Sequence, residues 1–269
     1  MHTTAYRYPH EHLILTFTLL LVLVVIALTA TATICASVVF IILFVAVSYN
    51  FSLSQHNALI REARLVTPQS MPDLAQVMQR GVARLQPGAV EAYVVSSKEL
   101  NAYTFGLSDP KTVVLYSALF QVMDADEILF ILGHELGHVA LGHTWLNSLV
   151  GGMAGIPASF SVAVILNAAF LWWNRACEYS ADRAGLLACA KPEKAISALV
   201  KLGAGSLGRG RYNLEEVYRR LDAEDDQLSG GLNEILATHP LLIHRIQELR
   251  KFVASDQYRR LKAHLDGGQ

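Results

Sequence analysis

The chain has 269 residues, of which 52% are hydrophobic and only 17% are charged, and its net charge is −1. Soluble domains have about 25% charged residues, so this composition indicates membrane segments rather than a large dry core. The near-zero net charge provides no basic field, and we exclude a nucleic-acid partner. The three cysteines form no CxxC pair and do not indicate a disulfide framework.

The excess of apolar residues is concentrated near the N-terminus, where residues 13–47 carry no charge. One transmembrane helix needs about 20 residues, so this run fits two short spans that meet at TATAT (Thr29–Thr33), or one long tilted helix. A signal peptide is the alternative, but its apolar region is about 7–15 residues long. We therefore expect residues 1–50 to form a membrane anchor, and we favour a hairpin of two short transmembrane helices.

A hairpin places both of its flanks on the same side of the membrane. Arg7 precedes the apolar run, and Arg61 and Arg64 follow it. Because positively charged flanks stay in the cytoplasm, we expect a multi-pass protein of the cell (inner) membrane. Residues 51–269 are then a cytoplasmic domain.

The next elements are two helices and a group of strands. Residues 51–65 and the segment TPQSMPDLAQVMQRGVARL are predicted helices, and Ser70 is the expected N-cap of the second. Three runs rich in Val, Tyr, Thr and Phe are predicted strands, with a turn at SDP between the last two: residues 90–97, 100–106 and 111–117. Asp124 then begins a helix, because DADE has the capping-box pattern with Glu127 at its third position. The pattern predicts a mainly α fold with a small β-sheet.

This helix contains the sequence GHELGHVALGH (133–143). Residues four positions apart on a helix lie about 40° apart on one face, so His134 and His138 can bind one metal ion. Glu135 lies about 100° around the helix, close enough to act on a water at that metal. His143 falls about 180° away, and we expect it outside the site unless the helix breaks.

The alternative for this segment is an amphipathic helix with two ordinary histidines. Gly133 and Gly137 argue against it, because each glycine costs about 1 kcal/mol of helix stability. Glycines at these positions indicate that another element or a peptide comes close to the helix.

A catalytic zinc ion has three protein ligands and one open position, so a third ligand is required. The segment NRACEYSADRAG offers Glu178 and Asp182 on one helical face, after a strongly apolar stretch. Buried carboxylates are costly unless they are paired or bind a cation. We interpret Glu178 as the third ligand and Asp182 as the acceptor for the free ring nitrogen of a zinc-bound histidine. The alternative is two salt bridges, from Glu178 to Arg175 and from Asp182 to Arg183.

Residues 144–174 also carry no charge, but they are too few for two membrane crossings, which need about 40 residues. A single crossing would leave His138 and Glu178 on opposite sides of the bilayer. We therefore expect two antiparallel, membrane-proximal helices, about 124–150 and 158–189, that rest on the membrane or dip into it.

HExxH followed by ExxxD, behind an N-terminal anchor, resembles the HtpX-type membrane zinc endopeptidases, a gluzincin pattern related to the CAAX prenyl proteases. NAY (Asn101–Tyr103) resembles the family's NAF stretch, which lies on an edge strand and receives substrate backbone. THPLLIHRI (238–246) resembles a C-terminal element whose histidine faces the active site. The resemblance runs from about Asn101 to Leu249 and more loosely into the anchor. It implies a metal-dependent peptidase with a mostly helical fold and a small sheet beside the cleft.

Carried over by position, the resemblance implies one zinc ion per chain, bound by His134, His138 and Glu178. Glu135 would be the general base that activates a zinc-bound water and returns the proton to the leaving amine. His239 would stabilise the developing oxyanion, and the alternative for this histidine is a helix-start residue before a proline.

The remaining positions of the resemblance concern the substrate and the C-terminal element. Asn101, Ala102 and Tyr103 would contact the substrate, and the alternative for Tyr103 is a plain strand aromatic. Arg245 is expected to be structural, and His244 is expected to be a surface or packing residue.

Two other classes of function compete with a peptidase. A non-proteolytic membrane scaffold or chaperone would hold a structural metal or none, but structural zinc sites need no base and fill all four positions with protein. Intramembrane site-2-type cleavage would need an Asp ligand from another membrane helix, and the nearby Asp-Pro lies in a turn. We therefore predict that residues 51–269 are the metalloprotease domain of a membrane-anchored zinc endopeptidase. Its expected partners are the lipid bilayer and polypeptide substrates, namely membrane or misfolded proteins.

Overall fold

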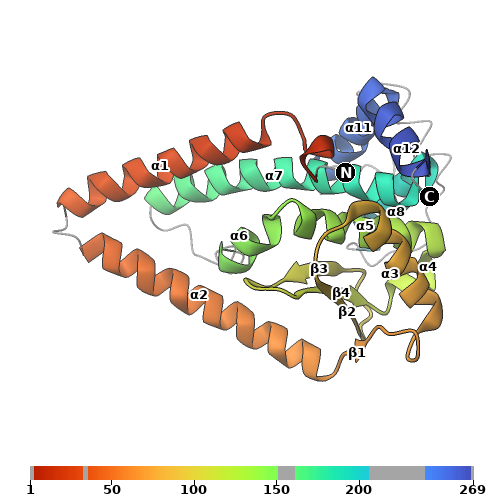
Figure 1. The fold of residues 1–269 in the computed structure, drawn as a ribbon. Helices are drawn as coiled ribbons and strands as arrows, with labels where there is room; N and C mark the ends of the chain where they lie inside the picture. Colours follow the sequence, from red (N-terminus) through yellow and green to blue (C-terminus); the bar gives the residue numbers. More distant parts are fainter. Residues whose placement is uncertain (1–2, 33–35, 151–160, 206–239, 268–269) are drawn as a thin grey trace.

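The computed structural model describes residues 3–32, 36–150, 161–205 and 240–267. This part of the chain is mainly helical and contains one four-stranded sheet (Figure 1), which confirms the predicted fold class. Up to the end of the sheet, the elements are η1 (Thr3–Tyr6, a 3-10 helix), α1 (Glu11–Ala32), α2 (Ala36–Arg61), β1 (Arg64–Leu65), α3 (Pro72–Leu85), β2 (Val90–Val95), β3 (Ala102–Phe105) and β4 (Lys111–Tyr116). The elements that follow are α4 (Leu119–Val122), α5 (Ala125–Ala140), α6 (His143–Val150), α7 (Ser161–Cys189), α8 (Pro192–Gly205), α11 (Pro240–Ala254) and α12 (Asp256–Gly267).

The N-terminal apolar run forms most of α1 and the first half of α2, and the two helices converge at one end of the molecule and diverge toward its body (Figure 1). Within the described residues, one segment, Glu11–Leu28 of α1, is long and apolar enough to cross a membrane. Residues 51–61 are helical as predicted, but they continue α2 instead of forming a separate helix, and Arg64 and Leu65 form β1. Large apolar side chains are exposed on both helices: Leu13, Phe17, Leu19, Leu20, Leu23, Val24, Leu28, Val39, Ile42, Leu43, Val47 and Phe51.

The sheet has the strand order β1-β2-β4-β3, and its last three strands are those predicted from the sequence. β2 runs parallel to β4, whereas β3 is antiparallel to β4 and forms one edge of the sheet. Ser70 is not the N-cap of α3, because Met71 occupies that position. The Ser70 hydroxyl instead donates a hydrogen bond to the Leu65 carbonyl (2.6 Å) and accepts one from the Thr67 amide (2.9 Å), closing the turn before the helix.

Helix α5 begins with the predicted capping box. The Asp124 carboxylate accepts hydrogen bonds from the backbone amides of Asp126 and Glu127, each at 3.0 Å, and Glu127 accepts one from the Asp124 amide at 2.8 Å. Glu127 is buried and also pairs with Lys201 of α8 at 2.7 Å. These contacts fix the start of α5 against α8.

The expectation of one continuous helix from 124 to 150 is wrong at residues 141 and 142. α5 ends at Ala140, Gly142 has a φ of +80°, and α6 begins at His143. This left-handed conformation is open to glycine at little cost, and it turns the chain before His143. The expected meeting of the two long helices at 151–157 lies outside the described residues.

Helices α5 and α7 pack with their backbones almost in contact, and they run in opposite directions (Figure 1). A Cβ atom built on Gly133 would lie 2.4 Å from the Ala188 Cβ, and one on Gly137 would lie 2.5 Å from the Ala184 Cβ. The expectation that these glycines mark a close approach is confirmed. The core of the domain surrounds this pair and includes Leu115, Leu119, Leu129, Phe130, Leu132, Leu136, Leu186, Leu187, Leu199, Ile246, Leu249 and Phe252.

The close approach of α5 and α7 predicts a difference between two glycine substitutions. Gly133→Ala forces apart two backbones, whereas at Gly81 the nearest atom to a new Cβ is the mobile end of the Leu136 side chain, at 2.9 Å. Both substitutions gain the same helix propensity, about 1 kcal/mol. We expect the free energy of unfolding of Gly133→Ala to be lower than that of Gly81→Ala by about 1–3 kcal/mol, the cost of overpacking. Denaturant unfolding of the two variants in detergent measures this difference, and equal stability would contradict it.

Candidate active site

Two imidazoles and one carboxylate converge between α5 and α7. The Nε2 atoms of His134 and His138 lie 3.2 Å apart, and the Glu178 oxygens lie 3.6 and 3.4 Å from them, respectively. Zinc bonds to nitrogen and oxygen are about 2.0–2.1 Å long, so tetrahedral ligand atoms are about 3.3 Å apart. The separations in the structure match that value, and a single metal ion can contact all three groups.

The outer ring nitrogen of His134 and both nearby carboxylates have partners of their own. His134 Nδ1 lies 2.9 Å from the Asp182 Oδ1 atom. Arg245 of α11 donates two hydrogen bonds to Asp182, at 2.7 and 2.8 Å, and lies 3.0 Å from Glu178. The structure therefore pairs Glu178 and Asp182 with Arg245. The alternative salt bridges, to Arg175 and Arg183, do not form at these carboxylates. Arg245, which we expected to be structural, contacts both acidic residues of the site.

Arg245 decides the charge state of these two carboxyl groups. Burial would raise the pKa of Glu178 and of Asp182, but the neighbouring guanidinium, together with the histidines, lowers both. Both groups therefore remain carboxylates at neutral pH. Glu178 can act as a metal ligand, and Asp182 can accept the His134 hydrogen bond.

Glu135 lies between the two histidines in the sequence of α5 and is only 6% exposed. Its burial raises the pKa of its carboxyl group, and the neighbouring histidines oppose this shift only in part. A carboxylate with a raised pKa accepts a proton more readily and suits general-base catalysis.

His143 does not lie on the opposite side of the helix from the cluster, because the chain turns at Gly142. The Nδ1 atoms of His143 and His138 lie 3.0 Å apart. The Nε2 atom of His143 lies 3.0 Å from Glu11, at the start of α1. Sequence reasoning missed Glu11, although this acid stands directly before the apolar run. His143 is not grouped with His134, His138 and Glu178, but it contacts His138.

The family model for peptidase family M48 matches residues 68–253, which include this whole cluster. The chain belongs to peptidase family M48. The family match supports a metallopeptidase function. The match, together with the HtpX relatives below, confirms the predicted resemblance to the HtpX-type family.

Curated relatives of this M48 chain carry matching names. Plastoglobule-localized metallopeptidase 48 of Arabidopsis thaliana is 28% identical over 211 residues, which are 73% of this chain and 61% of that protein. Protease HtpX of Nitrosococcus oceani is 26% identical over 211 residues, covering 66% of this chain and 70% of the relative. An HtpX homolog of Streptococcus gordonii is 24% identical over 253 residues, covering 77% and 82%. The match thus spans 61% of the length of the Arabidopsis relative.

The edge strand β3 of the M48 chain lies beside α5 and α6, but the Tyr103 side chain does not point to the histidine cluster. Its hydroxyl lies 3.3 Å from Nδ1 of His56 in α2, and its ring contacts Tyr116. Thr104 faces the other way and hydrogen-bonds to Thr144 of α6 at 3.0 Å. Asn101 is exposed just before the strand.

The C-terminal element of the M48 chain is described only in part. His239 lies outside the described residues, and α11 begins at the following residue, Pro240. His244 is exposed, as expected for a surface residue. Arg245, on the next position, is the residue of this element that contacts the cluster.

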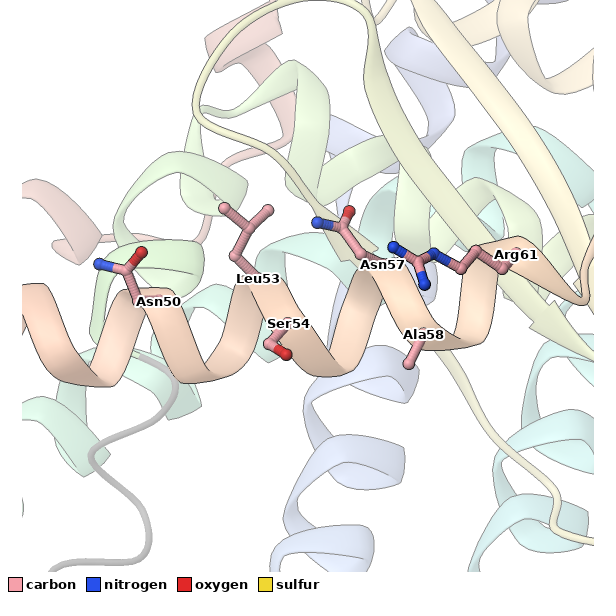
Figure 2. Close-up of a pocket in the computed structure, with 6 residues that line it drawn as sticks. All are labelled: Asn50, Leu53, Ser54, Asn57, Ala58 and Arg61. Carbon is pink, nitrogen blue, oxygen red and sulfur yellow. The ribbon is translucent and has the colours of Figure 1, made fainter.

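A hollow of about 340 Å³ lies along α2, which is far in the sequence from the cluster of His134, His138 and Glu178. Figure 2 shows the six side chains that line it, all from this one helix: Asn50, Leu53, Ser54, Asn57, Ala58 and Arg61. His134, His138 and Glu178 do not line this hollow. The shape of the surface therefore does not assign the site, and the assignment depends on the chemistry of the cluster.

The pairing of Arg245 with two carboxylates predicts a pH-dependent loss of stability. In metal-free protein, Arg245→Met leaves two largely buried carboxylates without a cation, and we expect a cost of about 3–5 kcal/mol at neutral pH. Since Arg245 lowers both folded-state pKa values, its contribution is complete above the unfolded-state values, about 4. This contribution to stability is lost as the pH falls through the folded-state pKa values of the two carboxyl groups, which are lower.

The difference between wild type and Arg245→Met should therefore shrink below about pH 4. Thermal unfolding of chelator-treated protein across a pH series measures it. Arg245→Lys is the matched control, because it keeps the charge but loses the two-pronged contact, and it should fall between the two. A pH-independent difference would show that packing, rather than charge, accounts for the effect.

Proposed function

We propose that this M48 member is a membrane-anchored, zinc-dependent endopeptidase that hydrolyses peptide bonds in membrane or misfolded proteins. The observation that carries the proposal is the spacing of His134, His138 and Glu178, whose ligand atoms lie 3.2–3.6 Å apart. The buried Glu135 next to this group supports catalysis rather than a structural role, because structural zinc sites need no base.

The donor set fits zinc. Two imidazole nitrogens and one carboxylate oxygen are typical ligands of catalytic zinc, which keeps one position open. Both histidines have a hydrogen-bonding partner on the ring nitrogen that faces away from the cluster, Asp182 for His134 and His143 for His138. Such partners fix the tautomer and the orientation of a ligand.

When bound, zinc supplies a Lewis acid that polarises the scissile carbonyl and makes water acidic enough to attack near neutral pH. Glu135 accepts a proton from the attacking water and delivers it to the leaving amine. Its raised pKa suits both steps, since the acid must form and then give up the proton. Glu178, whose pKa is held low, stays ionised throughout.

Substrate binding and oxyanion stabilisation are assigned by position in the family pattern. Among the described residues, β3 pairs with β4 alone, so its outer edge offers backbone groups to an extended peptide. Asn101, Ala102 and the backbone of Tyr103 are the proposed contacts. His239 is the proposed donor to the oxyanion, one position before α11.

The proposed membrane contact extends beyond α1 and α2. Leu171 and Trp172 of α7 and Trp145 of α6 are about half exposed, and Phe17 of α1 lies with its ring against Trp172. Exposed apolar and aromatic side chains are typical of a lipid interface. We propose that α1 and α2 form the anchor of a multi-pass cell-membrane protein, with the active site in the cytoplasm close to the lipid.

Glu135→Gln tests the general base. The amide is isosteric but accepts no proton, so we expect zinc content to stay at one per chain while proteolysis of an unfolded substrate falls by about 10²–10⁴-fold. Glu127→Gln is the matched control, a buried acid at the other end of the same helix, and it should keep its activity. Wild-type activity in Glu135→Gln would remove the proposed base.

Glu178→Ala tests the third ligand. Losing the hydrogen-bonding partner of a ligand typically weakens metal binding about 10–100-fold. Losing one of the three ligands themselves should weaken zinc binding by more than this. Elemental analysis after dialysis measures the zinc content. Glu248→Ala, which removes a carboxylate paired with surface Lys251, serves as the control. Unchanged zinc stoichiometry in Glu178→Ala would show that the third ligand lies elsewhere.

A further inference from the structure

The two histidines of the proposed metal site are supported in different ways. His134 contacts a carboxylate directly, through the 2.9 Å contact of Nδ1 with Asp182. His138 contacts a second histidine, since its Nδ1 atom lies 3.0 Å from Nδ1 of His143. His143 in turn lies 3.0 Å from the Glu11 carboxylate through Nε2. His138 therefore also reaches a carboxylate, but by way of one intermediate ring.

The proton positions along this path follow from metal binding at His138. A metal at Nε2 uses the lone pair of that nitrogen, so the ring proton must be on Nδ1. His138 Nδ1–H then donates to His143 Nδ1, which must be the unprotonated nitrogen of its ring. The remaining proton is on His143 Nε2, and it is donated to Glu11. Each N–H on the path thus has an acceptor, with both rings neutral and Glu11 ionised.

Glu11 is held firmly for a residue so near the N-terminus. It is 2% exposed, pairs with Arg7 and accepts a hydrogen bond from the Ser180 hydroxyl of α7. The Ser180 hydroxyl also accepts a hydrogen bond from the Tyr8 amide at 2.8 Å. Arg7 donates to the Leu141 carbonyl at 2.9 Å, just before the turn that presents His143. These contacts join the start of α1 to the turn that ends α5.

We propose that Glu11 is a positioning residue for the metal site, which orients His138 through His143 and makes the first turn of the membrane helix part of the metal centre. A carboxylate that is only 2% exposed is costly unless it is paired. One partner of Glu11 is a ring that contacts a proposed zinc ligand. The inference rests on the proposed function, because it requires zinc at His134, His138 and Glu178.

A second metal site is the competing interpretation of the same residues, because ligand atoms of Glu11, His143 and Cys177 lie within 4.8 Å of one another. Three observations favour positioning. Arg7 already neutralises Glu11, both nitrogens of His143 are in contact with other groups, and burial raises the pKa of the Cys177 thiol, which opposes the thiolate that a metal needs.

The test is a zinc titration of full-length protein in detergent micelles, in competition with a chromophoric chelator. We expect Glu11→Ala to weaken the apparent zinc affinity by about 10–100-fold, the usual loss for a partner of a ligand. Glu11→Gln should stay much closer to wild type, because the amide oxygen still accepts the His143 hydrogen bond. The absorption spectrum of the Co²⁺-substituted protein should shift in Glu11→Ala and not in Glu11→Gln.

Two further variants separate positioning from folding. Glu127→Ala is the matched control, since it also removes a buried acid paired with a cation and a serine hydroxyl. It should lower the thermal stability without changing the zinc affinity. His143→Phe keeps a ring of similar size but breaks the path, and it carries the test if Glu11→Ala fails to fold. The double variant Glu11→Ala, His143→Phe should lose no more affinity than either single one, because both act through one path.

Each result has a defined meaning. Wild-type zinc affinity in both Glu11→Ala and His143→Phe, with one zinc per chain, would overturn the inference and leave the proposed function standing. Two zinc ions per wild-type chain, one of them lost in Cys177→Ala, would replace positioning with a second metal site. A wild-type protein that binds no zinc would overturn the proposed function and this inference together.

Discussion

The contact between α5 and α7 through Gly133 and Gly137 is the constraint on which the rest of the structure depends. With a Cβ atom at either glycine, the helices would have to separate, since Ala188 and Ala184 already occupy that space. At the spacing that glycine allows, the histidines of one helix and Glu178 of the other reach a common point. The distance between ligands is therefore set by backbone packing, which is stiffer than side-chain packing because it has no rotamers to change.

Buried charge is the second constraint, and one cation resolves much of it. Three acidic side chains, Glu135, Glu178 and Asp182, gather in a region that two helices largely close to water. Arg245 keeps two of them ionised and leaves Glu135 with a raised pKa. Carboxylates in one small volume thereby differ in proton affinity, which suits Glu178 to the proposed role of ligand and Glu135 to the proposed role of base.

Features with a local signal were predictable from the sequence, and features that depend on distant partners were not. The capping box at Asp124 and the approach marked by the helical glycines depend on residues a few positions apart, and the structure confirms both. The sequence predicts a continuous helix across Gly142, because glycine is tolerated inside helices. The φ of +80° at Gly142, which breaks this helix, is not visible in the sequence. The contacts of Arg245 and Glu11 join segments far apart in the chain. No periodicity reports such pairs, and the resemblance alone did not place Arg245 at the cluster.

The cluster and its supports come from four separate segments, α1, α5, α7 and α11. One of these is near the beginning of the chain and another near its end, with α11 starting only at Pro240. A ribosome-bound chain has Glu178 long before it has the cation that neutralises it. The carboxylates of α7 therefore lack this partner until α11 has been made and has packed against α7.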